Sequence, residues 1–328
     1  MELKKAEALN TSTNQTYIFT SDNLGTLKKW DAKKHVLLED MGKIHNHGIF
    51  AMCSDPNGQF LVTTSGEGDI KIWDVNTCKL LLQNLDAHEG LQIDCCDIDS
   101  TGRHLFTGGA NGIFRMWDTK TLECTRDYKN AHGCSLTAMK IHGDFIYTGD
   151  AAGTLKLWTI SVKKRDPNAP MLVPTALLAT ACFKSFGPIH PQCVDSMVFT
   201  SDGQWMFSGD SGGYLKQFDN KKKVLEKNYQ CVTSEVSAMA ISNNDEYVFV
   251  SNDLGSMKQF SVSDKRCIAS WDNLHEMAIN ALAISENDTK LWTAGTGGVL
   301  KCWSFESQEL VMDYGEVHEG TIYAMEYV

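Results

Sequence analysis

Short runs of apolar and β-branched residues recur along the chain, separated by turn residues. Between two of these runs lies Asp-Pro-Asn-Gly at 55–58, and between the next two lies the glycine pair of 66–68. This pattern is typical of short strands joined by tight turns. No segment sustains the 3.6-residue period of an amphipathic helix. The runs predicted as strands in one complete unit are 49–53, 60–64, 70–73 and 79–83.

The same unit is repeated with a period of about 43 residues, marked by an aromatic residue that a histidine follows about fifteen positions later. The aromatic marks are Trp30, Trp73, Trp117, Trp158, Phe218, Phe260 and Trp303. The histidine marks are His45, His88, His132, His190, His275 and His318, and Val232 stands where the remaining one would fall. Two marks in one register predict seven copies of a single unit.

A four-stranded unit of this length cannot bury both of its faces alone, so its copies must pack against one another. Paired helices of armadillo type do not fit, because each unit contains two glycine-rich breaks. The sequence therefore predicts an all-β fold, a seven-bladed β-propeller of four-stranded antiparallel blades. We expect a single domain over residues 1–328.

Several strand endings resemble those of the WD40-repeat family: Lys-Lys-Trp-Asp at 28–31, Ile-Trp-Asp at 72–74 and Met-Trp-Asp at 116–118. With the histidine before each first strand, the resemblance covers nearly the whole chain. It implies a propeller, but it says little about function, because one such scaffold serves many unrelated roles.

The resemblance also implies a buried hydrogen-bonded network in each blade, built from the histidine, a strand Ser or Thr, a turn Asp and the Trp. At the turn position usually held by Asp stand Leu24, Glu67, Asn111, Ala152, Gly212, Leu254 and Gly297. We therefore expect the network to be incomplete in every blade. Asp22, Asp150, Asp210 and Asn252 lie two positions earlier and are expected to cap the turns through the following amides, with ligand binding as the alternative.

The two ends of the chain supply the pieces of one blade. Residues 322–327 repeat a first strand, and residues around 18 and 30 match a second and a third strand. We expect 322–327 to pair with 17–20 and close the ring, which removes exposed strand edges. Residues 6–11 are a less apolar rival for the same place.

One insertion interrupts the repeat after Trp158. Residues 161–176 hold three prolines and the basic run Lys163, Lys164 and Arg165. The segment is either a solvated excursion at the rim or a docking loop, since long irregular loops on a rigid scaffold often carry function.

The register also selects a binding face. In the family, two positions of each blade face the narrower opening of the ring: the residue just before the first strand, and the residue two positions after that residue. Relatives such as the β subunit of heterotrimeric G proteins hold partners at this opening. The second set here is Phe50, Asp94, Thr137, Asp195, Ser237, Asn280 and Tyr323. Phe50 and Tyr323 should lie in adjacent blades, either as anchors for a partner or simply packed between blades. The carboxylates favour a basic or amphipathic protein segment.

Composition limits the kinds of partner that the protein can bind and the cell compartment in which it is expected. The chain has 328 residues, 42% of them hydrophobic, and a net charge of -11, which argues against nucleic-acid binding. Its eleven cysteines show neither zinc spacing nor a disulfide framework, and no apolar run is long enough to insert into a membrane. We therefore expect a cytoplasmic protein that is monomeric by itself.

No catalytic, cofactor-binding or metal site is predicted. The His-Glu pairs at 88–89, 275–276 and 318–319 lack the second histidine of a zinc protease, and the glycine-rich turns lack the Lys-Ser/Thr of a phosphate loop.

The sequence favours a non-enzymatic interaction scaffold. A ubiquitin-ligase substrate receptor is a first alternative, although Trp-Asp at 73–74 and at 117–118 lacks the following Arg of such receptors. A cytoskeletal or ciliary component is a second alternative, by analogy with the Lys-Gln-Phe endings at 216–218 and 258–260. An enzyme that uses the channel is the least supported.

Overall fold

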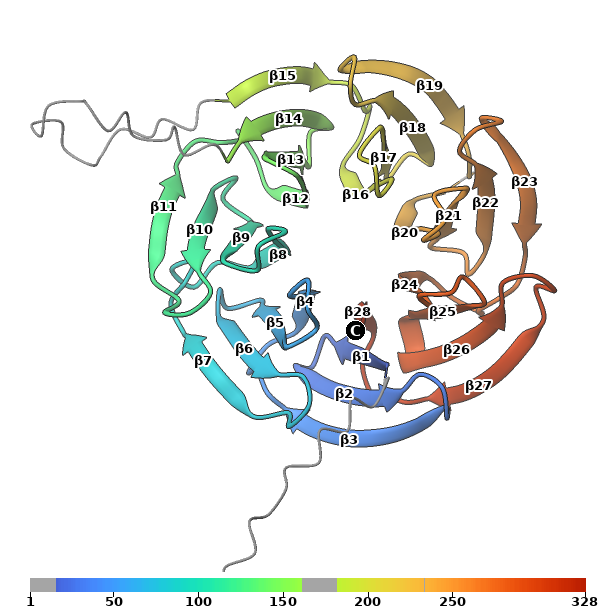
Figure 1. Ribbon diagram of the computed structural model, residues 1–328, viewed down its shortest axis with the longest axis horizontal. Coiled ribbons are helices and arrows are strands. Elements are labelled where there is room, and N and C mark those ends of the chain that lie inside the picture. Colours follow the sequence, from blue (N-terminus) through green and yellow to red (C-terminus); the bar gives the residue numbers. More distant parts are fainter. Residues whose placement is uncertain (1–15, 161–181, 233) are drawn as a thin grey trace, which may run out of the picture.

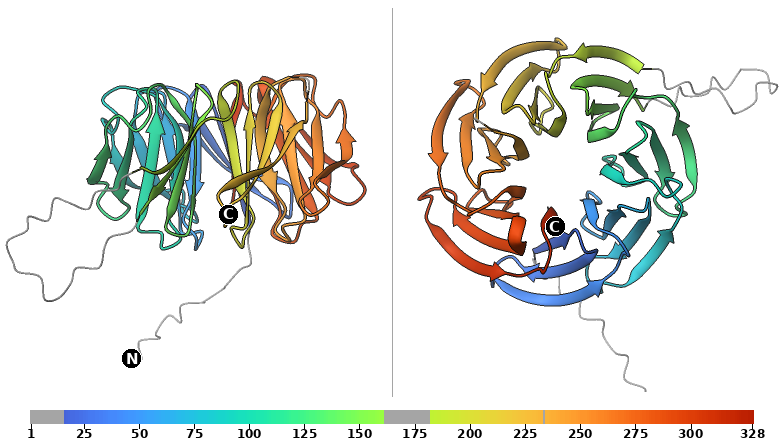
Figure 2. Two further views of the ribbon diagram at one scale, coloured as in Figure 1. Left: turned by 90° about the horizontal axis from the view of Figure 1, so that it is seen from above. Right: turned by 180° about the vertical axis from the view of Figure 1, so that it is seen from behind.

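Seven four-stranded antiparallel sheets surround a central channel in the computed structural model, which describes residues 16–160, 182–232 and 234–328. Figure 1 looks along the channel, and the side view in Figure 2 shows the ring as a short cylinder. The predicted all-β, seven-bladed propeller is confirmed. The runs predicted from 49–53 to 79–83 agree with strands β4 to β7 to within about one residue at each end.

Each blade contributes one strand to each of four concentric positions. The innermost strands are β28 (Ile322–Tyr327), β4 (Ile49–Ser54), β8 (Ile93–Ile98), β12 (Leu136–His142), β16 (Val194–Phe199), β20 (Val236–Ile241) and β24 (Ile279–Ile284). The second strands are β1 (Tyr17–Asp22), β5 (Phe60–Ser65), β9 (His104–Gly109), β13 (Phe145–Asp150), β17 (Trp205–Asp210), β21 (Tyr247–Asn252) and β25 (Lys290–Gly295). We number the blades 1 to 7 in this order.

The two outer positions complete each blade. The third strands are β2 (Thr26–Asp31), β6 (Ile70–Asp74), β10 (Phe114–Asp118), β14 (Thr154–Thr159), β18 (Tyr214–Asp219), β22 (Met257–Ser261) and β26 (Val299–Ser304). The outermost strands are β3 (Val36–Lys43), β7 (Leu80–Asn84), β11 (Cys124–Tyr128), β15 (Cys182–Pro188), β19 (Val224–Gln230), β23 (Arg266–Trp271) and β27 (Leu310–Glu316). Within the described ranges, a single turn of 3₁₀ helix, η1 (Thr296–Gly298), is present, and no helix is long and apolar enough to cross a membrane.

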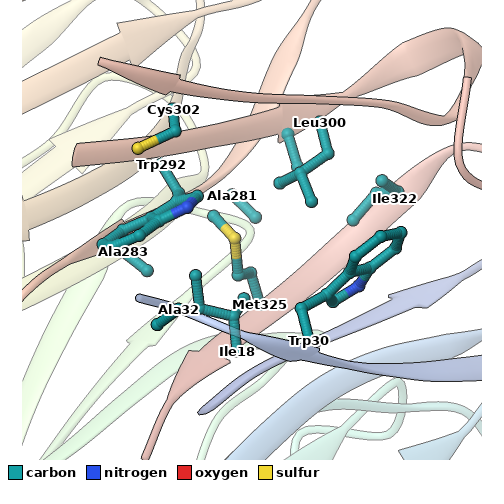
Figure 3. Close-up of a cluster of buried hydrophobic side chains, with 11 residues drawn as sticks. Ile18, Trp30, Ala32, Ala281, Ala283, Trp292, Leu300, Cys302, Ile322 and Met325 are labelled. Atoms are coloured by element: carbon teal, nitrogen blue, oxygen red, sulfur yellow. The ribbon is translucent and has the colours of Figure 1, made fainter. Parts of the chain in front are cut away.

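The hydrophobic core lies between neighbouring blades. Figure 3 shows one such cluster, in which Ile18 and Trp30 of blade 1 meet Trp292 and Leu300 of blade 7. Ile322 of β28 is completely buried in the same cluster. Because each blade buries its faces against two neighbours, the ring is one continuous packed structure.

The ring closes through the C-terminal strand, as predicted. β28 runs antiparallel to β1, with Thr20 opposite Met325 and Ile18 opposite Tyr327. The amide of Tyr17 also donates to the carbonyl of Val328, at 2.7 Å. The rival segment, residues 6–11, lies outside the described residues, and its proposed place beside β1 is taken by β28.

The prediction that the buried network is incomplete in every blade is wrong. In blade 4, His132 is hydrogen-bonded to Thr148 and to the carboxylate of Asp150, each at 2.7 Å, and the indole of Trp158 donates to Thr148 at 2.8 Å. The carboxylate at the end of the second strand reaches the histidine although it stands two positions before the expected place.

Blade 1 has the same complete network, formed by residues from both ends of the chain. His318 bonds to Thr20 at 2.8 Å and to Asp22 at 3.2 Å, and Trp30 donates to Thr20 at 3.0 Å. Although burial raises the pKa of Asp22, its bonds with His318 and with Thr26 prevail and lower that pKa to about 2. Closure of the ring is therefore reinforced by a buried polar contact.

The predicted turn caps are confirmed. The carboxylate of Asp150 accepts the amides of Ala152 and Thr154, at 3.0 and 2.7 Å. Asp22, Asp210 and Asn252 accept the corresponding amides of their own turns. The glycine in the turn is required by space, since a Cβ on Gly153, which has a φ of +78°, would lie 2.1 Å from the carbonyl oxygen of His190.

Candidate protein-binding site

All seven residues selected by the register line one hollow at the centre of the ring, with a volume of about 380 Å³. They are Phe50, Asp94, Thr137, Asp195, Ser237, Asn280 and Tyr323. The hollow is bounded by the innermost strands that surround the opening in Figure 1. The structure therefore brings together a set of residues that are spread over seven repeats of the sequence.

A β-bulge in each blade directs these side chains. In β4 the pairing register shifts between Ile49 and Ala51, so Phe50 is the extra residue. The same shift occurs at the equivalent place in the other innermost strands, and in β28 it leaves out Tyr323. A bulge re-aims the side chain that it leaves unpaired. The preceding residue, such as the fully buried Ile49, keeps the strand fixed to the core.

One side of the hollow is aromatic. The rings of Phe50 and Tyr323 lie 5.3 Å apart between centroids, and they come from blades 2 and 1. Their predicted placement in adjacent blades is confirmed. Phe50 is half-buried, whereas 40% of Tyr323 is exposed. The pair therefore packs across the blade boundary and still presents apolar surface to the channel.

Carboxylates line other blades of the hollow, with Asp94 in blade 3 and Asp195 in blade 5. Burial raises the pKa of both Asp94 and Asp195, although each accepts a stabilising bond: the amide group of Gln92 donates to Asp94, and the hydroxyl of Ser211 donates to Asp195 at 2.7 Å. A raised pKa means that desolvation of the charge outweighs these bonds. A cation brought to either carboxylate would compensate that cost.

Glu235 adds a third carboxylate to the hollow, in blade 6, and it is not among the residues selected from the sequence. Burial raises its pKa first, and the nearby carboxylates of Asp195 and Asp253 raise it further. Glu235 stands directly before β20, at the other register position that the family resemblance assigns to the narrow face. The position of Glu235 in the repeat could therefore have identified it from the sequence.

Deeper in the channel, Lys140 lies among carboxylates. Its Nζ is 3.7 Å from the Oδ1 of Asp97, and this charge raises the pKa of Lys140. Glu326 accepts both the amide and the hydroxyl of Ser54, at 3.1 and 2.7 Å, and burial raises its pKa. Lys140, the cation that lines the described part of the hollow, is thus already balanced by the neighbouring carboxylates of Asp97 and Glu326.

The histidines serve the scaffold rather than the channel. His88 and His275 bond to Thr107 and Thr293 inside their blades, at 2.8 and 2.6 Å. His318 is held by Thr20 and Asp22, as described above. The basic run Lys163, Lys164 and Arg165, together with the predicted insertion 161–176, lies outside the described residues.

Comparison with known proteins agrees with this geometry. The family described as WD domain, G-beta repeat matches residues 39–74, 79–118 and 181–219. Together with the closed ring of seven four-stranded blades, this match defines the class of protein. The three matched repeats and the WD-repeat relatives support a WD40-repeat β-propeller.

Among curated relatives, the chain is similar to Protein NEDD1. It is 34% identical to the mouse protein over 113 residues, which are 34% of this chain and 17% of that protein. It is 30% identical to the human protein over 139 residues, which are 41% of this chain and 21% of that protein. The matched region thus spans about a fifth of the length of these relatives.

A more extended similarity links the chain to a guanine nucleotide-binding protein subunit beta-like protein of Encephalitozoon cuniculi. The two are 23% identical over 280 residues, which cover 79% of this chain and 80% of that protein. This match extends over most of the ring, whereas the NEDD1 matches cover a few blades.

Proposed function

We propose that this propeller is a non-enzymatic protein-interaction scaffold that binds a basic or amphipathic segment of a protein partner at the mouth of its channel. The observation that carries the proposal is the lining of the hollow, in which an aromatic pair in blades 1 and 2 is combined with desolvated carboxylates in blades 3, 5 and 6. The WD-repeat relatives support a role in protein interaction.

The aromatic and the acidic residues of the hollow contribute to recognition in different ways. Phe50 and Tyr323 offer aromatic surface that a partner's apolar side chain can cover, and such aromatic anchors dominate the energy of many interfaces. Asp94, Asp195 and Glu235 attract a lysine or arginine and fix its position. Because the bulges fix the two aromatic residues, Asp94 and Asp195 in place, little conformational entropy is lost on binding.

Rigidity suits a scaffold. Each blade is joined to its neighbours through buried clusters, and the second-strand aspartates cap their turns, so the mouth is a fixed surface. The ubiquitin-ligase and cytoskeletal alternatives stay predictions, and an enzyme that uses the channel has no further support in the residues at the mouth.

The test is a pair of double variants, Phe50→Ala with Tyr323→Ala, and Asp94→Asn with Asp195→Asn. Proteins recovered with the wild-type chain are identified, and the affinity of one purified partner is then measured for each variant. We expect each double variant to weaken that affinity by about tenfold or more, a loss of about 1.4 kcal/mol.

Phe183→Ala provides a matched control, since 60% of this phenylalanine is exposed on the outer strand β15, away from the channel. It should leave binding unchanged. Melting temperatures should stay within about 4 °C of the wild type for all variants. A large fall in the melting temperature of the Phe50 and Tyr323 variant would mean that the two rings only pack between blades.

A further inference from the structure

Exposed aliphatic side chains gather on the outer strands of three consecutive blades. β27, β3 and β7 follow one another along the outside of the ring, as Figure 1 shows. Their exposed fractions range from 37% at Met312 to 51% at Leu81. We call the set the aliphatic band; it consists of Val36, Leu37, Leu38, Leu80, Leu81, Leu310, Val311 and Met312.

The band lies at one height on the ring. Leu310, Leu37 and Leu80 occupy the same register position, each opposite the Trp of the neighbouring third strand. The next residues, Val311, Leu38 and Leu81, are also exposed. Because the three outer strands are equivalent by the repeat, their side chains form a row around the circumference.

Backbone geometry explains why adjacent residues both face outward. In β3 the pairing register shifts between Lys29 and Trp30, which interrupts the alternation that would turn every second side chain inward. All seven outer strands have this shift beside their third strand. The fold therefore exposes two neighbouring positions in every blade.

Only blades 7, 1 and 2 fill both positions with aliphatic residues. The equivalent pairs elsewhere are Cys124-Thr125, Cys182-Phe183, Leu225-Glu226 and Cys267-Ile268. Edge strands of soluble proteins commonly carry charged residues that prevent association. An apolar surface concentrated in one sector of a ring of equivalent blades marks an interaction site.

The charges beside the band select the partner. Toward the mouth of the channel, exposed Glu39 and Glu316 border it, together with Asp40 and Asp313, which pair with Lys28 and Lys301. The opposite border is mixed, with Lys34 and Lys79 but also Glu306 and Glu309. Because the chain has a net charge of -11, a second copy of it would be repelled as a whole, whereas a basic partner would be attracted.

We propose that the aliphatic band binds an amphipathic helix of a protein partner, with an apolar face against the band and lysine or arginine along the flank nearest the mouth. A helix fits because the band crosses three strands around the circumference. A partner strand would instead pair with the edge of a single blade. This surface is on the outside of the ring and does not depend on the channel.

The test uses a fluorescent synthetic peptide of about 18 leucine and lysine residues in amphipathic helical order, a length at which such helices form in contact with a surface. Two comparison peptides have the same composition in scrambled order, or glutamate in place of lysine. We expect the wild-type protein to bind the first peptide at least about tenfold more tightly than either comparison, measured by fluorescence anisotropy.

Protein variants locate the binding. Leu38→Glu, Leu81→Glu and Val311→Glu together should abolish the preference for the first peptide. Leu225→Glu with Ile268→Glu, on equally exposed outer positions of blades 5 and 6, should retain it, and so should Phe50→Ala with Tyr323→Ala. Circular dichroism checks whether the glutamate substitutions disturb folding. If they do, the same three positions are changed to serine instead.

Three results would overturn the proposal. The first is equal binding of the peptide by the band variant and by its blade 5 and 6 control. The second is a wild-type dimer in sedimentation that the band variant turns into a monomer, because this would assign the band to a second copy of the chain. The third is loss of binding in the mouth variant alone, which would place the peptide in the channel instead.

Discussion

A single extra residue in each innermost strand decides what the channel presents. Phe50 and its equivalents face the hollow because the bulge leaves them out of the pairing, while the residues before them, Ile49 among them, are held in the core. A second residue-scale device is Asp150, whose carboxylate caps a turn and also bonds to His132. One side chain thus ties backbone geometry to the buried network.

Asp150→Ala removes two turn-capping bonds and leaves the Nδ1 of His132 without its partner. We expect the free energy of unfolding to fall by about 3 kcal/mol, measured by urea denaturation, because buried polar groups that lose a partner are costly. Asp253→Ala, an exposed aspartate in the corresponding turn of blade 6, should change it by less than about 0.5 kcal/mol. Equal effects would show that the bonds of Asp150 contribute nothing.

At the scale of elements, β28 differs from the other innermost strands. It reaches its blade only through the pairing with β1 and through buried contacts, whereas β4 continues directly into β5 by a turn. Ile322 and Ile49 hold equivalent positions, and both are completely buried. The two strands therefore have the same packing but a different connection to the chain.

This difference predicts unequal local opening. Ile322→Ala and Ile49→Ala should each lower the free energy of unfolding by about 3 kcal/mol. In hydrogen-exchange measurements, Ile322→Ala should speed exchange mainly in β28 and β1, because that pairing can separate without opening another blade. Ile49→Ala should not affect β28 selectively. Uniform acceleration in all blades by Ile322→Ala would show that the ring opens only as a whole.

At the scale of the whole molecule, the ring is stabilised by uncharged buried histidines. Burial lowers the pKa of His45 to about 3 and that of His88 and His275 to about 4, and the nearby cations Lys71, Arg115 and Lys301 contribute to this. The ordinary value is 6.5. Between these values the unfolded chain binds more protons than the folded one, so acid favours unfolding.

Stability should therefore be complete above about pH 6.5 and fall as the pH drops toward 4. The carboxylates with a raised pKa, such as Asp94 and Asp195, act in the opposite direction at low pH. Urea denaturation between pH 7 and 5 isolates the histidine effect when His88→Gln is compared with the exposed His47→Gln. We expect a shallower pH dependence only for His88→Gln, and an unchanged slope would contradict this assignment.

The repeat by itself determined the fold, the strands and the closure by residues 322–327, and its register together with the family resemblance selected the seven residues around the mouth. These features follow from local patterns and from a register that is copied seven times. Both can be recognised in the sequence without knowing which distant residues are in contact. The turn-capping role of Asp150 was also evident, because it involves neighbouring amides in the same segment.

Only the tertiary structure decided which distant groups meet. It joined Asp22 to His318, completed the buried networks of blades 1 and 4, and added Glu235 and Lys140 to the channel. It also placed Leu37, Leu80 and Leu310 in one exposed row. The physical reason is that these contacts depend on how the blades are arranged around a closed ring, whereas the sequence pattern describes each blade separately.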